Sequence, residues 1–182
     1  DFITVDGAEG GTGAAPLEFI DYMGMALADG LIFVSKVLKE YGLRDQIKIM
    51  ASGKIITGFD IAKAMSLGAD ACYSARGMMF ALGCIQALQC DSGKCPVGIA
   101  TQDKNLYKGL DITDKSVRVA HFHNNTLKAF AEFIGACGFD SPKAITPDVF
   151  YRRIDHKTNE SFASLFFNNY ENKTKTEKIN LN

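Results

Sequence analysis

Three cysteines that lie close together are the most chemically distinctive residues of the chain. Cys84, Cys90 and Cys95 are separated by five and four residues, and the sequence Pro-Val-Gly follows the last of them. This spacing matches neither the paired C-x2-C blocks of zinc ribbons nor the C-x2-C-x2-C run of bacterial ferredoxins. Three thiolates with a proline after the last one indicate an iron–sulfur cluster with three protein ligands.

A zinc site is the alternative, and it would need a fourth ligand. The candidates are His121 and His123, but on the expected helix their side chains point to different faces, so both cannot easily serve one metal. A third interpretation, three buried structural cysteines, is less favoured because the residues are clustered. We expect Cys72 and Cys137, which lie in apolar contexts, to be structural.

Two short segments, Ser52-Gly53-Lys54 and Ser74-Ala75-Arg76-Gly77, are suited to hold a phosphate, because each follows an expected strand. Gly53 lets backbone N–H groups face an anion, and a helix that begins a few residues later can add its positive end. Arg76 supplies a planar cation that matches phosphate oxygens. The alternative is that Lys54 and Arg76 are solvated surface charges.

A glycine-rich loop, residues 6–16, follows the first expected strand and contains Gly10 and Gly11. Its glycines and Pro16 exclude a helix or strand interior. Such a loop alone is most simply a flexible connection, but its position after a buried strand favours a ligand-binding loop.

Apolar strands and helices alternate regularly in the first half of the chain. The expected strands are 2–5, 46–50 and 69–73, and the expected helices are 17–23, 27–41, 57–67 and one from residue 76. This alternation indicates a parallel sheet, either doubly wound or closed into a barrel, with ligands at the carboxyl ends of its strands. A closed barrel usually needs about eight strands and roughly 250 residues. Because the chain opens inside a strand, we expect an α/β fold that is the carboxyl-terminal part of a (β/α)8 TIM barrel, its last three strands, followed by a helical extension.

The extension begins with a long helix, residues 112–137. We expect its buried stripe to contain Val117, Ala120, Leu127, Phe130 and Ile134. A short helix should start near Pro147. The expected organisation is a partial barrel domain at 1–157, with a cysteine loop at 84–102, and a polar tail at 158–182 whose first aromatic residues could dock.

Composition excludes several classes of protein. The 182 residues are 47% hydrophobic and carry a net charge of -1, which gives no electrostatic case for nucleic acid or an anionic membrane. No apolar run approaches membrane-spanning length. An odd number of cysteines, five, does not suggest a secreted disulfide framework, and we expect a reducing, cytoplasmic location.

Taken together, these motifs resemble the central synthase domain of glutamate synthase. The resemblance rests on Gly10–Pro16, on Ala51–Lys54 with Thr57-Gly58, and above all on the cysteine segment that ends Cys95-Pro-Val-Gly-Ile-Ala-Thr-Gln102. It covers 2–102 strongly and extends with weaker motifs to about residue 154.

The resemblance implies a (β/α)8 barrel that carries FMN beside a 3Fe-4S cluster. Cys84, Cys90 and Cys95 fall on the cluster ligands of the family. The phosphate loops of FMN fall on Ser52, Gly53, Lys54, Ala75 and Arg76, and the loop near flavin and substrate falls on Gly10 and Gly11. In this family, reduced FMN converts 2-iminoglutarate, formed from 2-oxoglutarate and ammonia, to L-glutamate. The cluster relays electrons from ferredoxin or a reductase subunit.

Two residues depart from the large enzymes of the family. Glu9 stands where they usually have Asp, and Arg76 is more like the phosphate arginine of hydroxyacid oxidases. These departures suggest the shorter relatives without a fused glutaminase. Another FMN barrel, such as a 2-hydroxyacid oxidase or a type 2 isopentenyl-diphosphate isomerase, is an alternative that does not need the cysteines. We assign no catalytic residue, and a partial barrel could fail to bind flavin alone.

Overall fold

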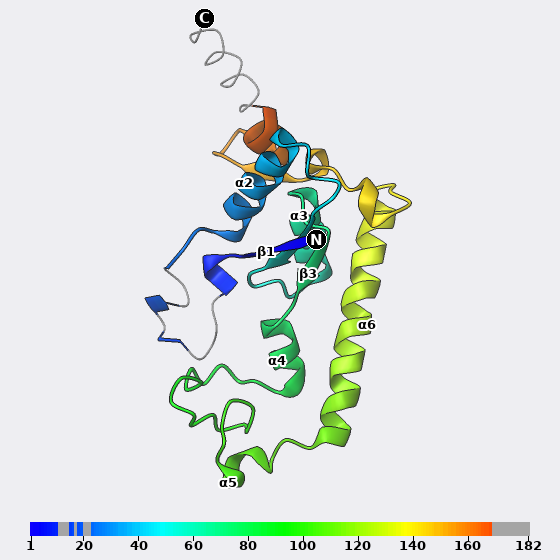
Figure 1. Ribbon diagram of the computed structural model, residues 1–182. Helices are drawn as coiled ribbons and strands as arrows, with labels where there is room; N and C mark the ends of the chain where they lie inside the picture. Colours follow the sequence, from blue (N-terminus) through cyan, green and yellow to red (C-terminus); the bar gives the residue numbers. More distant parts are fainter. Residues whose placement is uncertain (11–14, 17, 20–22, 169–182) are drawn as a thin grey trace, which may run out of the picture.

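A parallel sheet of three strands forms the centre of the fold (Figure 1). The computed structural model describes residues 1–10, 15–16, 18–19 and 23–168. Strands β1 (Phe2–Asp6), β2 (Lys48–Ser52) and β3 (Ala71–Tyr73) lie in the order β1-β2-β3, and both neighbouring pairs are parallel. All three strands therefore end at the same edge of the sheet.

Helices connect the strands in the alternation that the sequence predicts. Helix α2 (Leu27–Glu40) lies between β1 and β2, α3 (Gly58–Ser66) lies between β2 and β3, and α4 (Arg76–Leu82) follows β3. The α/β class with a parallel sheet is thus confirmed. The sequential strand order is the one that a barrel requires, but the assignment to the last three strands of a barrel stays a prediction.

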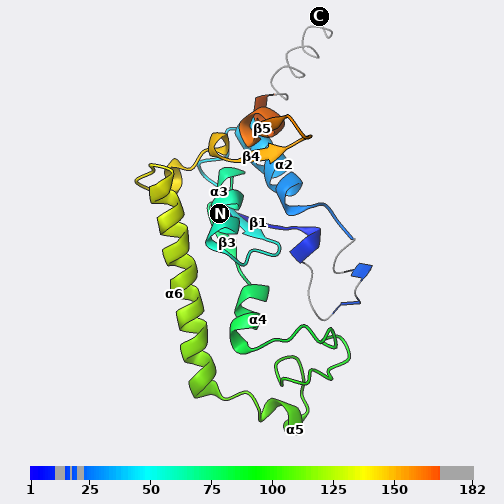
Figure 2. The ribbon, with the colours of Figure 1, turned by 180° about the vertical axis from the view of Figure 1, so that it is seen from behind.

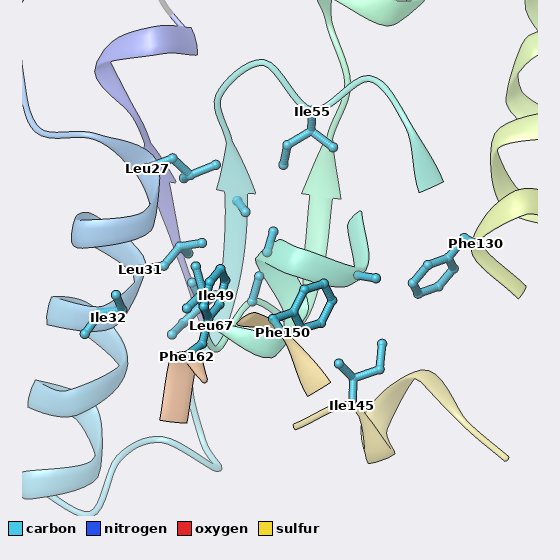
Figure 3. Close-up of a cluster of buried hydrophobic side chains, with 14 of the residues drawn as sticks. Leu27, Leu31, Ile32, Ile49, Ile55, Leu67, Phe130, Ile145, Phe150 and Phe162 are labelled. Atoms are coloured by element: carbon cyan, nitrogen blue, oxygen red, sulfur yellow. The ribbon is translucent and has the colours of Figure 1, made fainter. Parts of the chain in front are cut away.

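The two faces of the sheet differ in burial. On one face, Ile49 and Ala51 of β2 are completely buried against α2 and α3 (Figure 3). Alternate side chains along a strand point to opposite faces. On the other face, Phe2 and Tyr73 are exposed by 65% and 45%. This face of the sheet is therefore far less buried than the face against the helices.

A long helix, α6 (Ile112–Ala136), runs beside α3 and α4 (Figure 2). It buries Phe130 and Ile134, as predicted, but Val117, Ala120 and Leu127 are exposed, so that part of the predicted stripe is wrong. Glycines on the shorter helices select the actual contact face: a Cβ on Gly58 would lie 2.5 Å from the backbone nitrogen of Phe130.

Short elements complete the chain. They are the 3-10 helices η1 (Ala8–Gly10), η2 (Pro142–Ala144) and η3 (Pro147–Val149), helix α5 (Lys104–Tyr107), the antiparallel strands β4 (Tyr151–Arg153) and β5 (Asn159–Ser161), and the π-helix η4 (Ala163–Asn168). The expected boundary between residues 157 and 158 falls inside the β4–β5 hairpin. In the described ranges no helix has both the length and the apolar character needed to cross a bilayer.

Candidate functional site

Three loops meet where the parallel strands end. The Gly7 N–H after β1 donates to the Ser52 carbonyl oxygen at the end of β2, at 2.8 Å. Gly10 lies directly against Gly53, because a Cβ on Gly10 would be 2.7 Å from the Gly53 Cα atom. Two of the predicted cofactor glycines are therefore in contact. A side chain on Gly10 would displace the Gly53 loop, whereas a Cβ on Gly53 would meet the Leu27 side chain of α2 at 3.2 Å. Gly11, the third, lies outside the described residues.

Glu9 holds this loop to the start of α2. The N–H of Leu27, the first residue of that helix, donates to both carboxylate oxygens of Glu9, at 3.0 and 3.2 Å. No side chain caps α2 at Ala26, so Glu9 supplies the missing cap from 18 residues away. The sequence drew attention to Glu9 only as a departure from the family. The local sequence could not predict that Glu9 caps α2, because the capping box, which a sequence can reveal, joins residues only three positions apart.

The second junction is joined to the first through Ser74. Its hydroxyl donates to the Ile55 carbonyl oxygen at 2.7 Å, which links the end of β3 to the loop after β2. Arg76 begins α4 two residues later and is partly buried. Its guanidinium has no hydrogen bond or ion pair with any residue that the structure describes. No side chain caps α4 at Ala75. The geometry therefore brings Arg76 and Gly53 to one edge of the sheet, as predicted.

The start of α3 is not available to an anion, contrary to the sequence-based expectation. The Asp60 carboxylate accepts hydrogen bonds from the backbone of Ile56 and Thr57 and from the Thr57 hydroxyl. Thr57 in turn accepts the Asp60 N–H, which completes a capping box. The positive end of α3 is therefore already neutralised by the protein's own carboxylate.

Lys54 lies in the left-handed region with φ 49°, and its side chain is exposed. Together with Glu9 and Gly53 it lines a cavity of about 150 Å³ between α2 and α3. Typical small-molecule sites have volumes of roughly 300–1,000 Å³, so this cavity alone cannot enclose a flavin.

Cys84 is positioned by the end of α4. Gly83, with φ 104°, ends that helix, and the Cys84 N–H donates back to the Met79 carbonyl oxygen at 2.9 Å in a Schellman arrangement. The Cys84 sulfur also accepts the N–H of Gln86 at 3.4 Å. Arg76 and Cys84 thus stand at opposite ends of one short helix, separated by about 12 Å along its axis at 1.5 Å per residue.

Cys95 is buried inside a turn of backbone N–H groups. Burial of its thiol acts to raise the pKa, but hydrogen bonds from the N–H groups of residues 97–100 lower the pKa below its ordinary value. Gly98 makes this turn possible: its φ is 80°, and a Cβ there would be 2.5 Å from the Leu106 carbonyl oxygen. The predicted Cys-Pro-Val-Gly segment therefore builds a site that favours a thiolate.

All five cysteines are free thiols, and Cys84, Cys90 and Cys95 share one loop. Over the described ranges, however, no three His, Cys, Asp or Glu side chains are gathered closely enough to hold one metal ion. Both helix histidines proposed for a zinc site, His121 and His123, are exposed on α6. Thiolates are the ligands of an iron–sulfur cluster, but in this part of the chain neither the three cysteines nor the four ligands of a zinc site are gathered around one point.

Comparison with known proteins identifies the family. A family described as "Conserved region in glutamate synthase" matches residues 1–140. The chain belongs to the glutamate synthase family. The glutamate synthase region thus includes the three strand-end loops, the cysteine loop and all of α6, and it ends before the β4–β5 hairpin.

Several curated relatives carry the glutamate synthase name. The glutamate synthase large subunit-like protein YerD of Bacillus subtilis is 45% identical over 156 residues, which are 85% of this chain and 30% of that protein. The archaeal glutamate synthase [NADPH] of Methanocaldococcus jannaschii is 41% identical, over 80% of this chain and 28% of its own length. Ferredoxin-dependent glutamate synthase 2 of Synechocystis is 40% identical, over 60% of this chain and 7% of its own length. The chain therefore spans about a third or less of these relatives.

A sulfite-bound double mutant of flavocytochrome b2 is among the similar solved structures. It aligns over 81% of this chain and 34% of its own, with a TM-score of 0.48 and 16% identity.

Proposed function

We propose that this chain is the part of a glutamate synthase-type oxidoreductase that holds the phosphate of FMN and a 3Fe-4S cluster. The observation that carries the proposal is the partly buried Arg76, which has no ion pair or hydrogen bond with the residues that the structure describes. It begins a helix that no side chain caps, and Ser74 ties this helix start to the loop after β2. A partly desolvated cation attracts an anion more strongly than a fully solvated one, so this site favours an anionic ligand. Membership of the glutamate synthase family makes a flavin phosphate the natural anion.

The chain's own residues would act mainly by binding and orienting. Arg76, with the Ala75 and Gly77 backbone, would hold the phosphate, while Ser52 and Lys54 would flank it. Gly10 and Gly53 let the loops after β1 and β2 pack directly against each other at the strand ends, beside the proposed phosphate site. Bound FMN would supply two electrons for the C=N bond of 2-iminoglutarate, formed from 2-oxoglutarate and ammonia, to give L-glutamate.

Cys84, Cys90 and Cys95 would hold the cluster at the other end of α4. The N–H groups around the Cys95 sulfur stabilise negative charge there, as a cluster ligand requires. We propose ferredoxin or a reductase subunit as electron donor, since relatives are named for ferredoxin and for NADPH. The remaining part of the parent enzyme would supply the other wall of the barrel and most substrate contacts. Five free thiols agree with a reducing, cytoplasmic location.

The first test is an anaerobic absorption and EPR spectrum of the complete parent protein, with iron, sulfide and flavin analysis. We expect FMN together with a three-iron signal, and glutamate formation from 2-oxoglutarate and ammonia when a reductant is supplied. Flavin without iron would replace the proposal with a hydroxyacid oxidase-like barrel. Zinc without flavin would overturn the enzyme assignment altogether.

A cysteine substitution tests the ligand assignment separately. Cys90→Ser should abolish the cluster signal and leave FMN bound, because a cluster with three protein ligands has none to spare. Cys137→Ser, outside the loop, is the matched control and should keep both cofactors. An unchanged EPR spectrum in Cys90→Ser would remove Cys90 from the ligand set.

A further inference from the structure

We infer that a second cavity, on the helix side of the molecule, binds a small carboxylate with an apolar body, such as an aryl-alkanoate or a short fatty acid. The inference is independent of the proposed function. The cavity has a volume of about 450 Å³ and lies between α3, the end of α6 and the β4–β5 hairpin. That volume is in the range of small-molecule sites, unlike the smaller cavity behind Gly53.

Aromatic rings form the walls of this cavity. The rings of Phe59, Phe133 and Phe150 are 5.5–5.7 Å apart in all three pairings, and Phe150 continues to Phe162 at 5.7 Å. Figure 3 shows Phe150 and Phe162 near each other, away from the strand-end loop at Ile55. Phe59 remains 52% exposed, although its ring belongs to this cluster. An apolar ligand body would remove this ring from water.

Two cations border the apolar walls. Lys63 of α3 and Arg152 of β4 both line the cavity and are exposed. Neither side chain has a hydrogen bond or ion pair with a residue in the described part of the chain. No aspartate or glutamate lines the cavity. Carboxylates do lie nearby, since Glu160 is the cross-strand neighbour of Arg152 and Asp60 precedes Lys63 by one helical turn, but neither lines the cavity. This combination of an aromatic wall with two cations that form no close ion pair selects an anion that carries an apolar group.

The position of the cavity separates it from the flavin and cluster sites. Most of its lining comes from residues after 140, which lie outside the match to the glutamate synthase region. It nevertheless shares Ala28 and Lys63 with the small cavity at Gly53. A ligand in the aromatic cavity would therefore contact α3, the helix that follows the Gly53 loop.

The test is calorimetric titration of the full chain with 4-phenylbutyrate, and with 4-phenylbutan-1-ol as the uncharged control. We expect saturable binding of the carboxylate at least tenfold tighter than that of the alcohol. Arg152→Gln with Lys63→Gln should remove this preference, while Lys157→Gln, an exposed lysine that does not line the cavity, should retain it. Equal affinity for acid and alcohol, or no binding of either, would overturn the inference.

A second measurement does not depend on any variant. Cys137 lines the cavity, so saturating 4-phenylbutyrate should slow its alkylation by iodoacetamide several-fold in the wild-type chain. Peptide mass spectrometry measures the alkylation of the other cysteines in the same sample, and their alkylation rates should not change. Unaltered labelling of Cys137 under saturating ligand would place the bound molecule elsewhere.

Discussion

At the residue scale, the two predicted phosphate-binding cations have different surroundings. Lys54 is exposed at a left-handed turn, whereas Arg76 is partly buried at the start of α4. A sequence pattern assigns both residues equally, since it records charge and spacing but not burial. We therefore propose Arg76 as the main phosphate ligand, because a less solvated cation interacts more strongly with an anion.

Arg76→Ala should weaken FMN binding by about 1.5–3 kcal/mol, which is the cost of losing a charge-assisted hydrogen bond to phosphate. Flavin fluorescence titration measures the change. Lys104→Ala, an exposed lysine on α5, is the matched control and should leave the affinity unaltered. Identical affinities for wild type and Arg76→Ala would place this arginine on the solvated surface.

Cys72 makes stability sensitive to alkaline pH. Burial raises the pKa of its thiol from 9.0 to about 11, so the folded state favours the neutral form. A raised folded pKa gives a contribution that is complete below pH 9 and is lost as pH rises through about 11. Relative to Cys72→Val, the wild-type chain should lose up to about 2 kcal/mol of unfolding free energy over that window. Urea unfolding at a series of pH values checks this; parallel curves for the two proteins would contradict it.

At the element scale, most strands and helices were predicted within two residues, but the contact face of α6 was not. Apolar residues occur on several faces of that helix, so its sequence alone does not single out one stripe. The face is selected by Gly58 of α3 and Gly77 of α4, because the absence of a side chain at each glycine lets α6 approach closely. The β4–β5 hairpin was missed because strands as short and polar as Tyr-Arg-Arg and Asn-Glu-Ser have no alternating pattern.

Gly58→Ala should disrupt the packing of α3 on α6. The added Cβ would lie 2.5 Å from one backbone atom of Phe130, and backbone cannot move aside as a flexible side chain can. We expect a loss of about 1–3 kcal/mol in unfolding free energy. Gly135→Ala is the internal comparison, because nothing lies within 4 Å of its Cβ position on α6, and it should stabilise by about 0.5–1 kcal/mol. Equal effects of the two substitutions would exclude close packing at Gly58.

At the scale of the whole molecule, one aromatic cluster joins the carboxyl-terminal segment to the parallel sheet's helices. Phe150, just before β4, contacts rings from α3, from α6 and from the end of β5. The sequence predicted that Phe162 and the following phenylalanines could dock, and Phe162 is indeed buried. It did not predict the partners, which come from positions up to about a hundred residues apart, beyond the reach of local periodicity.

Phe150→Ala should destabilise the chain by about 3–5 kcal/mol, because this ring is only 4% exposed and its removal leaves a cavity. Tyr151→Ala, at a neighbouring side chain that is 67% exposed, should change stability by no more than about 0.5 kcal/mol. Denaturant unfolding followed by far-UV circular dichroism compares the two. A small effect at Phe150 would mean that the β4–β5 hairpin unfolds separately from the rest of the fold.

The hydrogen bond from the Leu27 amide to the Glu9 carboxylate gives the molecule a built-in reporter of ligand binding. Since the carboxylate holds the Leu27 amide from the same loop that meets Gly53, any ligand that shifts this loop must lengthen or tighten that hydrogen bond. Deuterium exchange at this single amide should then follow occupancy at the strand ends, even for a ligand without colour or fluorescence. The first turn of α2 would then report on binding at the strand ends through the Glu9 carboxylate.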